Sequence, residues 1–170
     1  MNIKNLLNSG QVVRFHNHVG IDKQSLAEHQ WGVAMIVQYI EPECSKDLLL
    51  AALTHDAAEY YTGDMPFPTK QANPKLKSML EELEKDWLAE NGLAGPFVNL
   101  TQPERVVLKA ADTLEGMWYC TLQMKQGNKC ADRPFRKWLD FMERLMMDVK
   151  VTEETEMMFK FVLKEREKWL

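Results

Sequence analysis

Apolar residues recur at helical spacing along almost the whole of this 170-residue chain, and this pattern constrains the fold more than any other feature. Runs that alternate between polar and apolar residues, as a half-buried strand requires, are short and few. Ser25-Leu-Ala-Glu28 and Thr101-Gln-Pro-Glu104 both have the spacing of a capping box, which marks the start of a helix. We therefore predict about seven helices, at residues 2–9, 25–41, 45–62, 73–91, 101–125, 132–148 and 152–168.

The segments between these helices are predicted to be loops. The two longest early ones are residues 11–24 (QVVRFHNHVGIDKQ) and residues 63–73 (GDMPFPTKQAN), and the second is stiffened by its two prolines. The sequence contains no internal repeat, low-complexity run or interdomain linker. We therefore expect an all-α protein that forms one domain over residues 1–170.

The composition indicates a folded protein without nucleic-acid or membrane partners. A hydrophobic fraction of 45% argues against disorder, and a net charge of −4 leaves no broad basic surface for a nucleic-acid backbone. No stretch approaches the roughly 18 apolar residues of a membrane span, and the first residues do not resemble a secretory signal. Three cysteines without CxxC spacing are typical of reduced thiols. We expect a cytoplasmic protein.

Four ionisable residues interrupt apolar helical segments: His29, the adjacent pair His55 and Asp56, and Asp112. Burying such groups costs several kcal/mol unless each finds a partner. Two histidines and two carboxylates suit a borderline divalent ion such as Zn, Mn, Co, Ni or Fe. Taken singly, each residue is more often a hydrogen-bonded core histidine, a helix cap or a salt-bridge partner. The complete set on separate helices, in the order His, His-Asp, Asp, favours a metal site.

The segments that carry these residues resemble the three motifs of the HD-domain metal-dependent phosphohydrolases. They are AEHQWGVA, LTHDAAEYYTGDMPFP and KAADTLE, and the matches span residues 14 to 119. The second is similar to the branch that includes bacterial 5′-deoxynucleotidases and short phage dATP triphosphohydrolases. The resemblance implies a single compact helical HD-domain bundle. It also implies that His29, His55, Asp56 and Asp112 bind one divalent transition metal (Zn, Co or Mn), with additional Mg on the substrate phosphates.

The same resemblance implies two proton-handling residues, Glu59 and Asp64. Glu59 follows His55 by one helical turn, so in a continuous helix it faces the same side. It would orient or deprotonate the attacking water or pass a proton to the leaving oxygen; the alternative is structural support of a histidine ligand. For Asp64, the alternative is an ordinary turn-forming aspartate.

Four residues are predicted to contact the substrate. In the resembling enzymes an Arg-aromatic pair before the first motif meets the nucleotide, and here that pair is Arg14 and Phe15, where a tryptophan is common at the second position. Lys70 is placed to reach an outer phosphate, unless it is simply solvated. Tyr119 lies seven residues beyond Asp112 and so shares its helix face.

The resemblance leaves two enzymatic functions open. The compact length and the cationic loop residues favour a dATP-type triphosphohydrolase that releases deoxynucleoside and triphosphate; the alternative is a 5′-deoxynucleotidase acting on monophosphates. An inactive metal- or nucleotide-binding helical module is the more distant alternative. Members of the family commonly form homo-oligomers, and we expect the seam on the last two helices, with Trp138, Phe141, Leu145 and Met146.

Overall fold

Helices make up most of the protein in the computed structural model, which describes residues 2–170. The strands among those residues are two residues long, and β1 (Val13–Arg14) pairs antiparallel with β2 (Gln24–Ser25). The predicted all-α class is confirmed. The helices are α1 (Ile3–Ser9), α2 (Leu26–Ile40), α3 (Lys46–Thr54), α4 (Glu59–Thr62), α5 (Phe67–Ala72), α6 (Pro74–Glu90), α7 (Ala94–Asn99), α8 (Gln102–Lys125), α9 (Asp132–Asp148) and α10 (Glu153–Glu167), with a 3-10 turn η1 (Lys129–Ala131) before α9.

Local capping signals placed most helix ends correctly. At the starts of α2 and α8 the hydroxyl oxygens of Ser25 and Thr101 accept the backbone N–H of the glutamate three residues on. The carboxylates of Glu28 and Glu104 accept the backbone N–H of the cap in return, as the capping box requires. Every predicted helix except the one at 45–62 agrees with an observed helix to within one residue at both ends.

The prediction of a single helix at 45–62 is wrong, because α3 ends at Thr54 and α4 begins at Glu59. Nδ1 of His55 lies 3.0 Å from the carbonyl oxygen of Ala52. The imidazole therefore takes a carbonyl of the last turn of α3 that a continuing helix would use for a backbone bond. This interruption decides where the second motif points its side chains.

Both predicted loops also contain regular structure. Residues 11–24 hold β1 and the start of β2, and residues 63–73 hold α5. Pro68 is the second residue of α5, where the missing N–H of proline costs no helical hydrogen bond. The loop prediction is therefore wrong for these stretches, and α5 forms one wall of the cavity described below.

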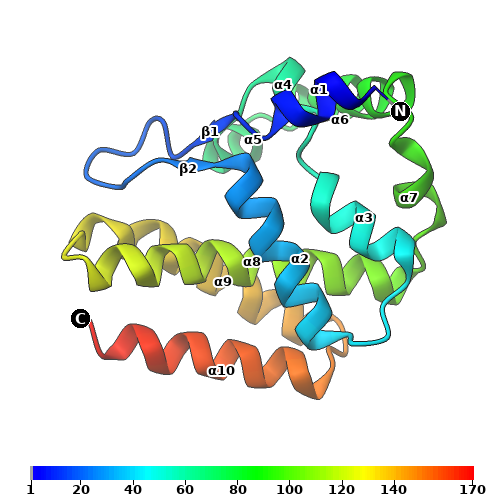
Figure 1. The fold of residues 1–170 in the computed structure, drawn as a ribbon. Helices are drawn as coiled ribbons and strands as arrows, with labels where there is room; N and C mark the ends of the chain where they lie inside the picture. Colours follow the sequence, from blue (N-terminus) through cyan, green and yellow to red (C-terminus); the bar gives the residue numbers. More distant parts are fainter. Residues whose placement is uncertain (1) are drawn as a thin grey trace.

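The long helix α8 lies at the centre of the packing. Helices α2, α9 and α10 each pack against α8, and α3 packs against both α2 and α8 (Figure 1). A smaller group of helices, α1, α4, α5 and α6, lies together at the top of Figure 1 and has its own apolar cluster around Trp87. The main core between α2, α3, α8, α9 and α10 includes the fully buried Val33, Val37, Leu48, Leu114, Met117, Phe135, Met142 and Val162.

The predicted oligomer seam on the last two helices stays a prediction, and its four side chains also make contacts within the protein's own fold. Trp138 faces α8, where a Cβ on Gly116 would lie 2.9 Å from its ring. Leu145 and Met146 pack against the main core, and Phe141 lines the cavity. These side chains serve the protein's own interior because α9 turns its apolar face toward α8.

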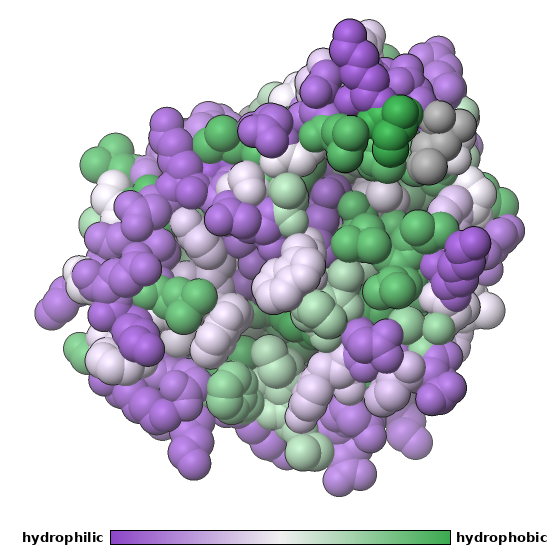
Figure 2. All heavy atoms as spheres, in the orientation of Figure 1, coloured by the Kyte–Doolittle hydropathy of each residue, from purple (hydrophilic) through white to green (hydrophobic). Residues whose placement is uncertain are grey.

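One row of exposed apolar residues lies on α2, and single ones such as Met147 and Met157 lie on α9 and α10. Trp31, Met35 and Tyr39 are spaced four residues apart on one helix face and are 64%, 45% and 50% exposed. Figure 2 shows hydrophobic residues scattered among hydrophilic ones on the face seen in Figure 1. Homo-oligomer formation stays a prediction. No helix within residues 2–170 is both long enough and apolar enough to cross a membrane.

Candidate active site

Three helices bring the four predicted metal ligands together. His29 lies on α2, His55 and Asp56 directly follow α3, and Asp112 lies on α8. Nε2 of His29 is 3.2 Å from Nε2 of His55 and 3.4 Å from Oδ1 of Asp112. Oδ2 of Asp56 lies 3.3 Å from Nε2 of His55 and 3.6 Å from Nε2 of His29. The ligand atoms of His29, His55 and Asp112 all lie within 4.8 Å of one another.

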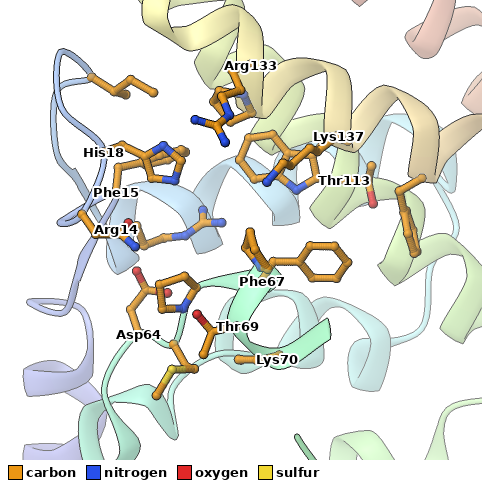
Figure 3. A pocket seen from close by; sticks show the side chains of 18 of the residues that line it. Arg14, Phe15, His18, Asp64, Phe67, Thr69, Lys70, Thr113, Arg133 and Lys137 are labelled. Carbon is orange, nitrogen blue, oxygen red and sulfur yellow. The ribbon is translucent and has the colours of Figure 1, made fainter. Parts of the chain in front are cut away.

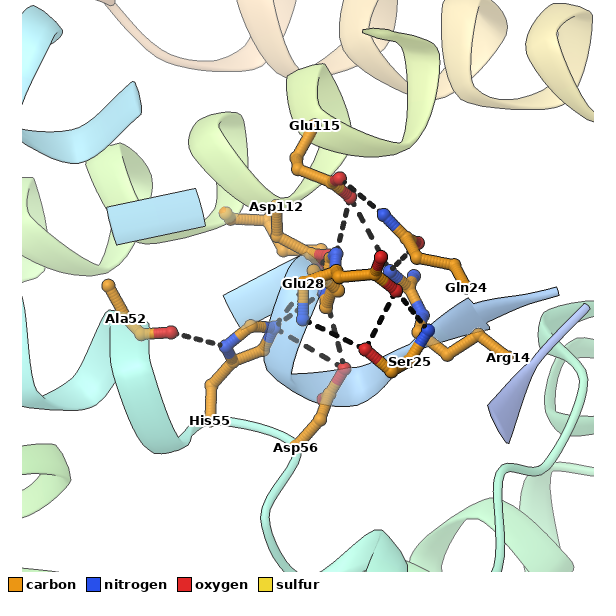
Figure 4. Close-up of polar contacts among 11 residues, drawn as sticks. Arg14, Gln24, Ser25, Glu28, Ala52, His55, Asp56, Asp112 and Glu115 are labelled. Atoms are coloured by element: carbon orange, nitrogen blue, oxygen red, sulfur yellow. Dashed lines mark hydrogen bonds and ion pairs between the residues drawn. The ribbon is translucent and has the colours of Figure 1, made fainter. Parts of the chain in front are cut away.

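The second ring nitrogen, Nδ1, of both His29 and His55 already has a hydrogen-bond partner. Nδ1 of His55 faces the carbonyl oxygen of Ala52 (Figure 4). Nδ1 of the fully buried His29 faces the carboxylate of Glu115. Carbonyl and carboxylate oxygens accept hydrogen bonds, so each Nδ1 carries a proton and donates it. In the neutral rings Nε2 therefore keeps its lone pair, which is the tautomer that a metal ligand needs.

The electrostatics of the cluster favour a positive charge at its centre. Burial raises the pKa of Asp56, but the adjacent His55 and hydrogen bonds from both histidines overcome this and hold the pKa well below its usual range. Burial likewise opposes ionisation of Asp112, while Lys109 and both histidines lower its pKa well below the usual value. Burial lowers the pKa of His55, but Asp56 and Asp112 raise it to about 10. Two ionised carboxylates thus hold a proton on the ring, as they would hold a cation.

His29, His55 and Asp112 pass a geometric test for a divalent metal, while Asp56 borders this group through its contacts with the two histidines. Ligands about 2.1 Å from a tetrahedral ion lie roughly 3.4 Å from one another. The two Nε2 atoms lie 3.2 Å apart, and the distances from them to the carboxylate oxygens are 3.3 to 3.8 Å, which are of that size. Two imidazoles and two carboxylates are an N/O donor set that suits Zn, Mn or Co.

Glu115 is a functional residue that the sequence reasoning missed. Its carboxylate holds Nδ1 of His29, accepts a 2.7 Å hydrogen bond from Nε2 of Gln24, and lies 3.4 Å from Nη1 of Arg14 (Figure 4). The sequence held a signal: a glutamate in an apolar stretch of α8, three residues after Asp112 and so on nearly the same helix face. Gly32 on α2 leaves it room, since a Cβ there would lie 2.8 Å from Cγ of Glu115.

Glu59 is buried at the first residue of α4, close to the ligand cluster and at the wall of the cavity. Burial and the carboxylates of Asp56 and Asp64 raise its pKa to about 9. Its Oε1 lies 3.9 Å from Nζ of Lys70, and Oε2 has no hydrogen-bond partner among residues 2–170. The carboxyl group therefore has an unused oxygen and a proton-holding tendency near neutral pH, which is the property of a general acid or base.

Asp64 also lines the cavity, one residue after a turn at Gly63. Gly63 has φ 78°, a left-handed conformation that favours glycine. Oδ2 of Asp64 lies 3.3 Å from Nδ1 of His16, which joins this turn to the hairpin loop. The structure brings Asp64 to the same cavity as Glu59 but gives it a partner on the surface side.

A cavity of about 1110 Å³ opens beside the ligand cluster, and Asp56 and Asp112 form part of its wall. Such a volume is at or above the upper end of ordinary small-molecule sites, so a nucleotide has room. Arg14, Phe15 and Lys70, three of the predicted substrate contacts, line it (Figure 3).

Arg14 and Phe15 both line the cavity, and both side chains are largely buried. The guanidinium of Arg14 is 12% exposed and donates to Oε1 of Gln24 at 3.0 Å. Phe15 has a left-handed φ of 59°, which is strained for a phenylalanine, and is 7% exposed. Such outliers gather at functional sites because the surroundings must hold them.

Tyr119 supports Phe15 instead of forming the cavity wall. The two rings stack with centroids 5.1 Å apart, and the Tyr119 hydroxyl donates to the carbonyl oxygen of Asp22 at 2.8 Å. Tyr119 is not among the residues that line the cavity. The direct contact of Tyr119 with substrate stays a prediction, and in the structure Tyr119 reaches the cavity through Phe15, which lines it.

The cavity has a second group of cations that the sequence reasoning did not single out. Lys109 Nζ lies 2.8 Å from Oδ2 of Asp112, and Arg133 and Lys137 extend from α9 toward the cavity (Figure 3). The four-residue spacing of Arg133 and Lys137 on an amphipathic helix was visible in the sequence. The sequence did not show which side of that helix faces the site.

Comparisons with known proteins agree with this geometry. A family model described as 5′-deoxynucleotidase YfbR-like matches residues 4–165. A 5′-deoxynucleotidase of Pasteurella multocida is 28% identical over 64% of this chain and 67% of its own length. A dATP triphosphohydrolase of Salmonella phage PMBT28 is 32% identical over 70% of this chain and 66% of its own length. The chain thus spans about two thirds of the length of these curated relatives.

Solved structures confirm the HD-type fold. A cyanophage S-2L HD phosphohydrolase, described as bound to dA and one catalytic Zn²⁺ ion, superposes with a TM-score of 0.77 at 23% identity, covering 99% of this chain and 98% of that one. An HD-domain phosphohydrolase of Listeria innocua superposes with a TM-score of 0.76 at 19% identity, covering 96% of this chain and 87% of that one. At these identities the likeness establishes the fold.

Proposed function

This chain belongs to the YfbR-like 5′-deoxynucleotidase family, and we propose that it is a metal-dependent phosphohydrolase that cleaves the 5′ phosphoester of deoxynucleotides. The observation that carries this proposal is the pair of facing Nε2 atoms, 3.2 Å apart, with two carboxylates beside them at the wall of a cavity large enough for a nucleotide. An inert helical module has no need for ligands arranged in this way.

His29, His55, Asp56 and Asp112 would hold the divalent ion, with Zn, Co or Mn as candidates and Mg on the substrate phosphates. When bound, such an ion polarises a phosphoryl oxygen and acidifies a water molecule. The carboxylate of Glu115 keeps His29 in the ligand tautomer and orientation.

Glu59 would take a proton from the attacking water or give one to the leaving 5′ oxygen. Its unpartnered Oε2 is available for that hydrogen bond, and a pKa of about 9 in the metal-free protein favours the protonated form. Asp64, which lines the same cavity, would share this proton handling. Both roles are proposals.

Arg14 and Lys70 would neutralise charge on the phosphate oxygens. Nζ of Lys70 lies 3.9 Å from the carboxyl groups of both Glu59 and Glu84, and a phosphate would compete with these groups for it. The ring of Phe15 would contact the sugar or base, with Tyr119 stacked behind it.

The size of the leaving group is a separate part of the proposal. We favour hydrolysis of a dATP-type triphosphate to deoxynucleoside and triphosphate, which is the activity named for the phage relative. The alternative is hydrolysis of deoxynucleoside monophosphates, because the Pasteurella relative and the family model carry the name 5′-deoxynucleotidase.

The test is chromatography of the products formed from dATP, dGTP, dCTP, dTTP and dAMP by purified protein with Zn, Co or Mn. Deoxyadenosine and inorganic triphosphate from dATP, without dADP, would establish the triphosphohydrolase. Deoxynucleoside from dAMP alone would establish the 5′-deoxynucleotidase. If no substrate releases phosphate or triphosphate with any of these metals, the enzymatic proposal is refuted.

We also propose an oligomeric state, a cellular location and the absence of a nucleic-acid partner. Homo-oligomer formation is supported by the exposed apolar row of Trp31, Met35 and Tyr39 on α2. A cytoplasmic location is supported by the cysteines, since the three in the sequence are free thiols in the structure. The net charge of −4 supports the absence of a nucleic-acid partner. Light scattering of the purified protein would test the assembly.

A further inference from the structure

One wall of the cavity is a face of α9. Arg133, Lys137 and Phe141 follow one another at four-residue spacing, so they lie in one row on that helix, and all three line the cavity. Figure 3 shows Arg133 and Lys137 extending toward the cavity from the side opposite Thr69 and Lys70 of α5. The cavity therefore has cations on two facing walls.

The two α9 cations differ from their neighbours in having no protein partner. Arg136, on the next face of the helix, is paired with Asp132 at 2.7 Å, and Arg166 of α10 is paired with the same aspartate. Neither Arg133 nor Lys137 takes part in an ion pair or side-chain hydrogen bond with another of residues 2–170. Their positive charges are therefore available to bind an anionic ligand in the cavity.

The pKa of a neighbouring histidine is affected by these charges. His18 of the hairpin loop lines the same cavity, and its pKa is lowered by burial and then by the positive charges of Lys137 and Arg133. Both cations therefore act at one place, beside the hairpin end of α9. Lys109 of α8, in contrast, is paired with the candidate ligand Asp112.

The requirements of the reaction connect this place to the substrate. If the bond to the 5′ oxygen is cleaved at the metal ligands, the α-phosphate must lie there, beside Asp56 and Asp112. The β- and γ-phosphates then extend away from the ligands and carry most of the negative charge of a triphosphate. A monophosphate has no β- or γ-phosphate and therefore no group that extends away from the metal ligands.

We propose that Arg133 and Lys137 form a subsite for the β- and γ-phosphates and thereby make the enzyme prefer deoxynucleoside triphosphates to monophosphates. The inference rests on the proposed phosphohydrolase function and deepens it, because it assigns the choice between the two substrate classes to one face of α9. Arg133 supplies a planar fork for two phosphate oxygens, and Lys137 supplies a point charge.

The test compares wild-type protein with the double variant Arg133→Gln/Lys137→Gln on dATP and dAMP. We expect kcat/KM for dATP to fall about 100-fold, about tenfold for each charge-assisted contact, mainly through KM. We expect kcat/KM for dAMP to change less than about threefold, because a monophosphate does not reach α9. The matched control is Arg144→Gln/Lys160→Gln, which removes the same two charge types from outside the cavity and should leave both substrates unaffected.

An equal loss on dATP and dAMP, or no loss on either, would overturn the subsite while leaving the phosphohydrolase function intact. Binding of inorganic triphosphate in excess Mg²⁺, measured by calorimetry, separates the two hypotheses if no deoxynucleotide is turned over. Weaker binding to the double variant than to wild type and the control would support the subsite without the proposed reaction. Equal binding to all three proteins would refute it.

Discussion

The carboxylate of Glu115 accepts a hydrogen bond from Nδ1 of His29, although the two residues are 86 positions apart and lie on different helices. The same carboxylate accepts from Nε2 of Gln24 through its other oxygen and lies against Arg14. One buried group thus fixes a metal-ligand candidate and joins it to a residue of the substrate cavity. The geometry of the site depends on this link between α2, α8 and the hairpin.

Glu115→Gln should weaken metal binding about 10- to 100-fold. A glutamine has one acceptor oxygen, so it cannot accept from both His29 and Gln24 as the carboxylate does. Calorimetric titration with Zn²⁺ or Co²⁺ would measure the effect, with the exposed Glu90→Gln as a control. Unchanged affinity in a folded Glu115→Gln protein would show that His29 does not depend on this contact.

Gly32→Ala should weaken metal binding severalfold without altering any polar group. The new Cβ would lie 2.8 Å from Cγ of Glu115, which must then move away from His29. Alanine favours a helix by up to about 1 kcal/mol over glycine, so circular dichroism should show α2 intact. Gly95→Ala on α7 is a matched control, since a Cβ there meets nothing within 4 Å. Equal affinities of the two variants would contradict the prediction.

Metal should stabilise the folded protein, and chelation should remove that stabilisation. A ligand at 100 times its dissociation constant adds about 2.7 kcal/mol to the free energy of unfolding if it binds only the folded state. Thermal unfolding with Zn²⁺ and then with a chelator would measure this in wild type. We expect no metal-dependent shift in His55→Ala and a normal shift in His16→Ala, whose histidine is at the surface beside Asp64. The reverse pattern would place the metal elsewhere.

Glu59→Gln should stabilise the metal-free protein at neutral and higher pH. The folded-state pKa of Glu59, about 9, lies above the ordinary value of 4.5, so the folded protein keeps a proton that the unfolded chain releases. That contribution is fully present below about pH 4.5 and is lost as pH rises toward 9. Wild type should therefore lose roughly 4 kcal/mol more than Glu59→Gln between pH 5 and pH 8.

Urea unfolding of both proteins without metal, at several pH values, would check this difference. Parallel stability curves would mean that Glu59 ionises normally in the folded state. With metal added, the same variant should turn over deoxynucleotide about 100-fold more slowly, because general acid–base catalysis is lost. Gain of stability together with loss of turnover is the pattern of a residue kept for function.

The sequence by itself determined the ends of most of the long helices and the chemical identity of the candidate metal ligands. The capping boxes at Ser25 and Thr101 are complete within four residues, so no distant contact is needed to place the starts of α2 and α8. His29 and Asp112 stood out because ionisable groups in apolar helices need partners, which is a property of residue type. The resemblance in motif order then joined these residues into one site.

Only the tertiary structure decided how that site is supported and what faces it. Glu115 holds His29 across 86 residues, and α9 presents Arg133 and Lys137 to a cavity whose other wall is α5. The break after Thr54 and the placing of Tyr119 behind Phe15 were likewise not predicted. Periodicity and caps are local, within one or two helical turns, whereas the orientation of one helix toward another depends on how buried side chains from the whole chain pack together.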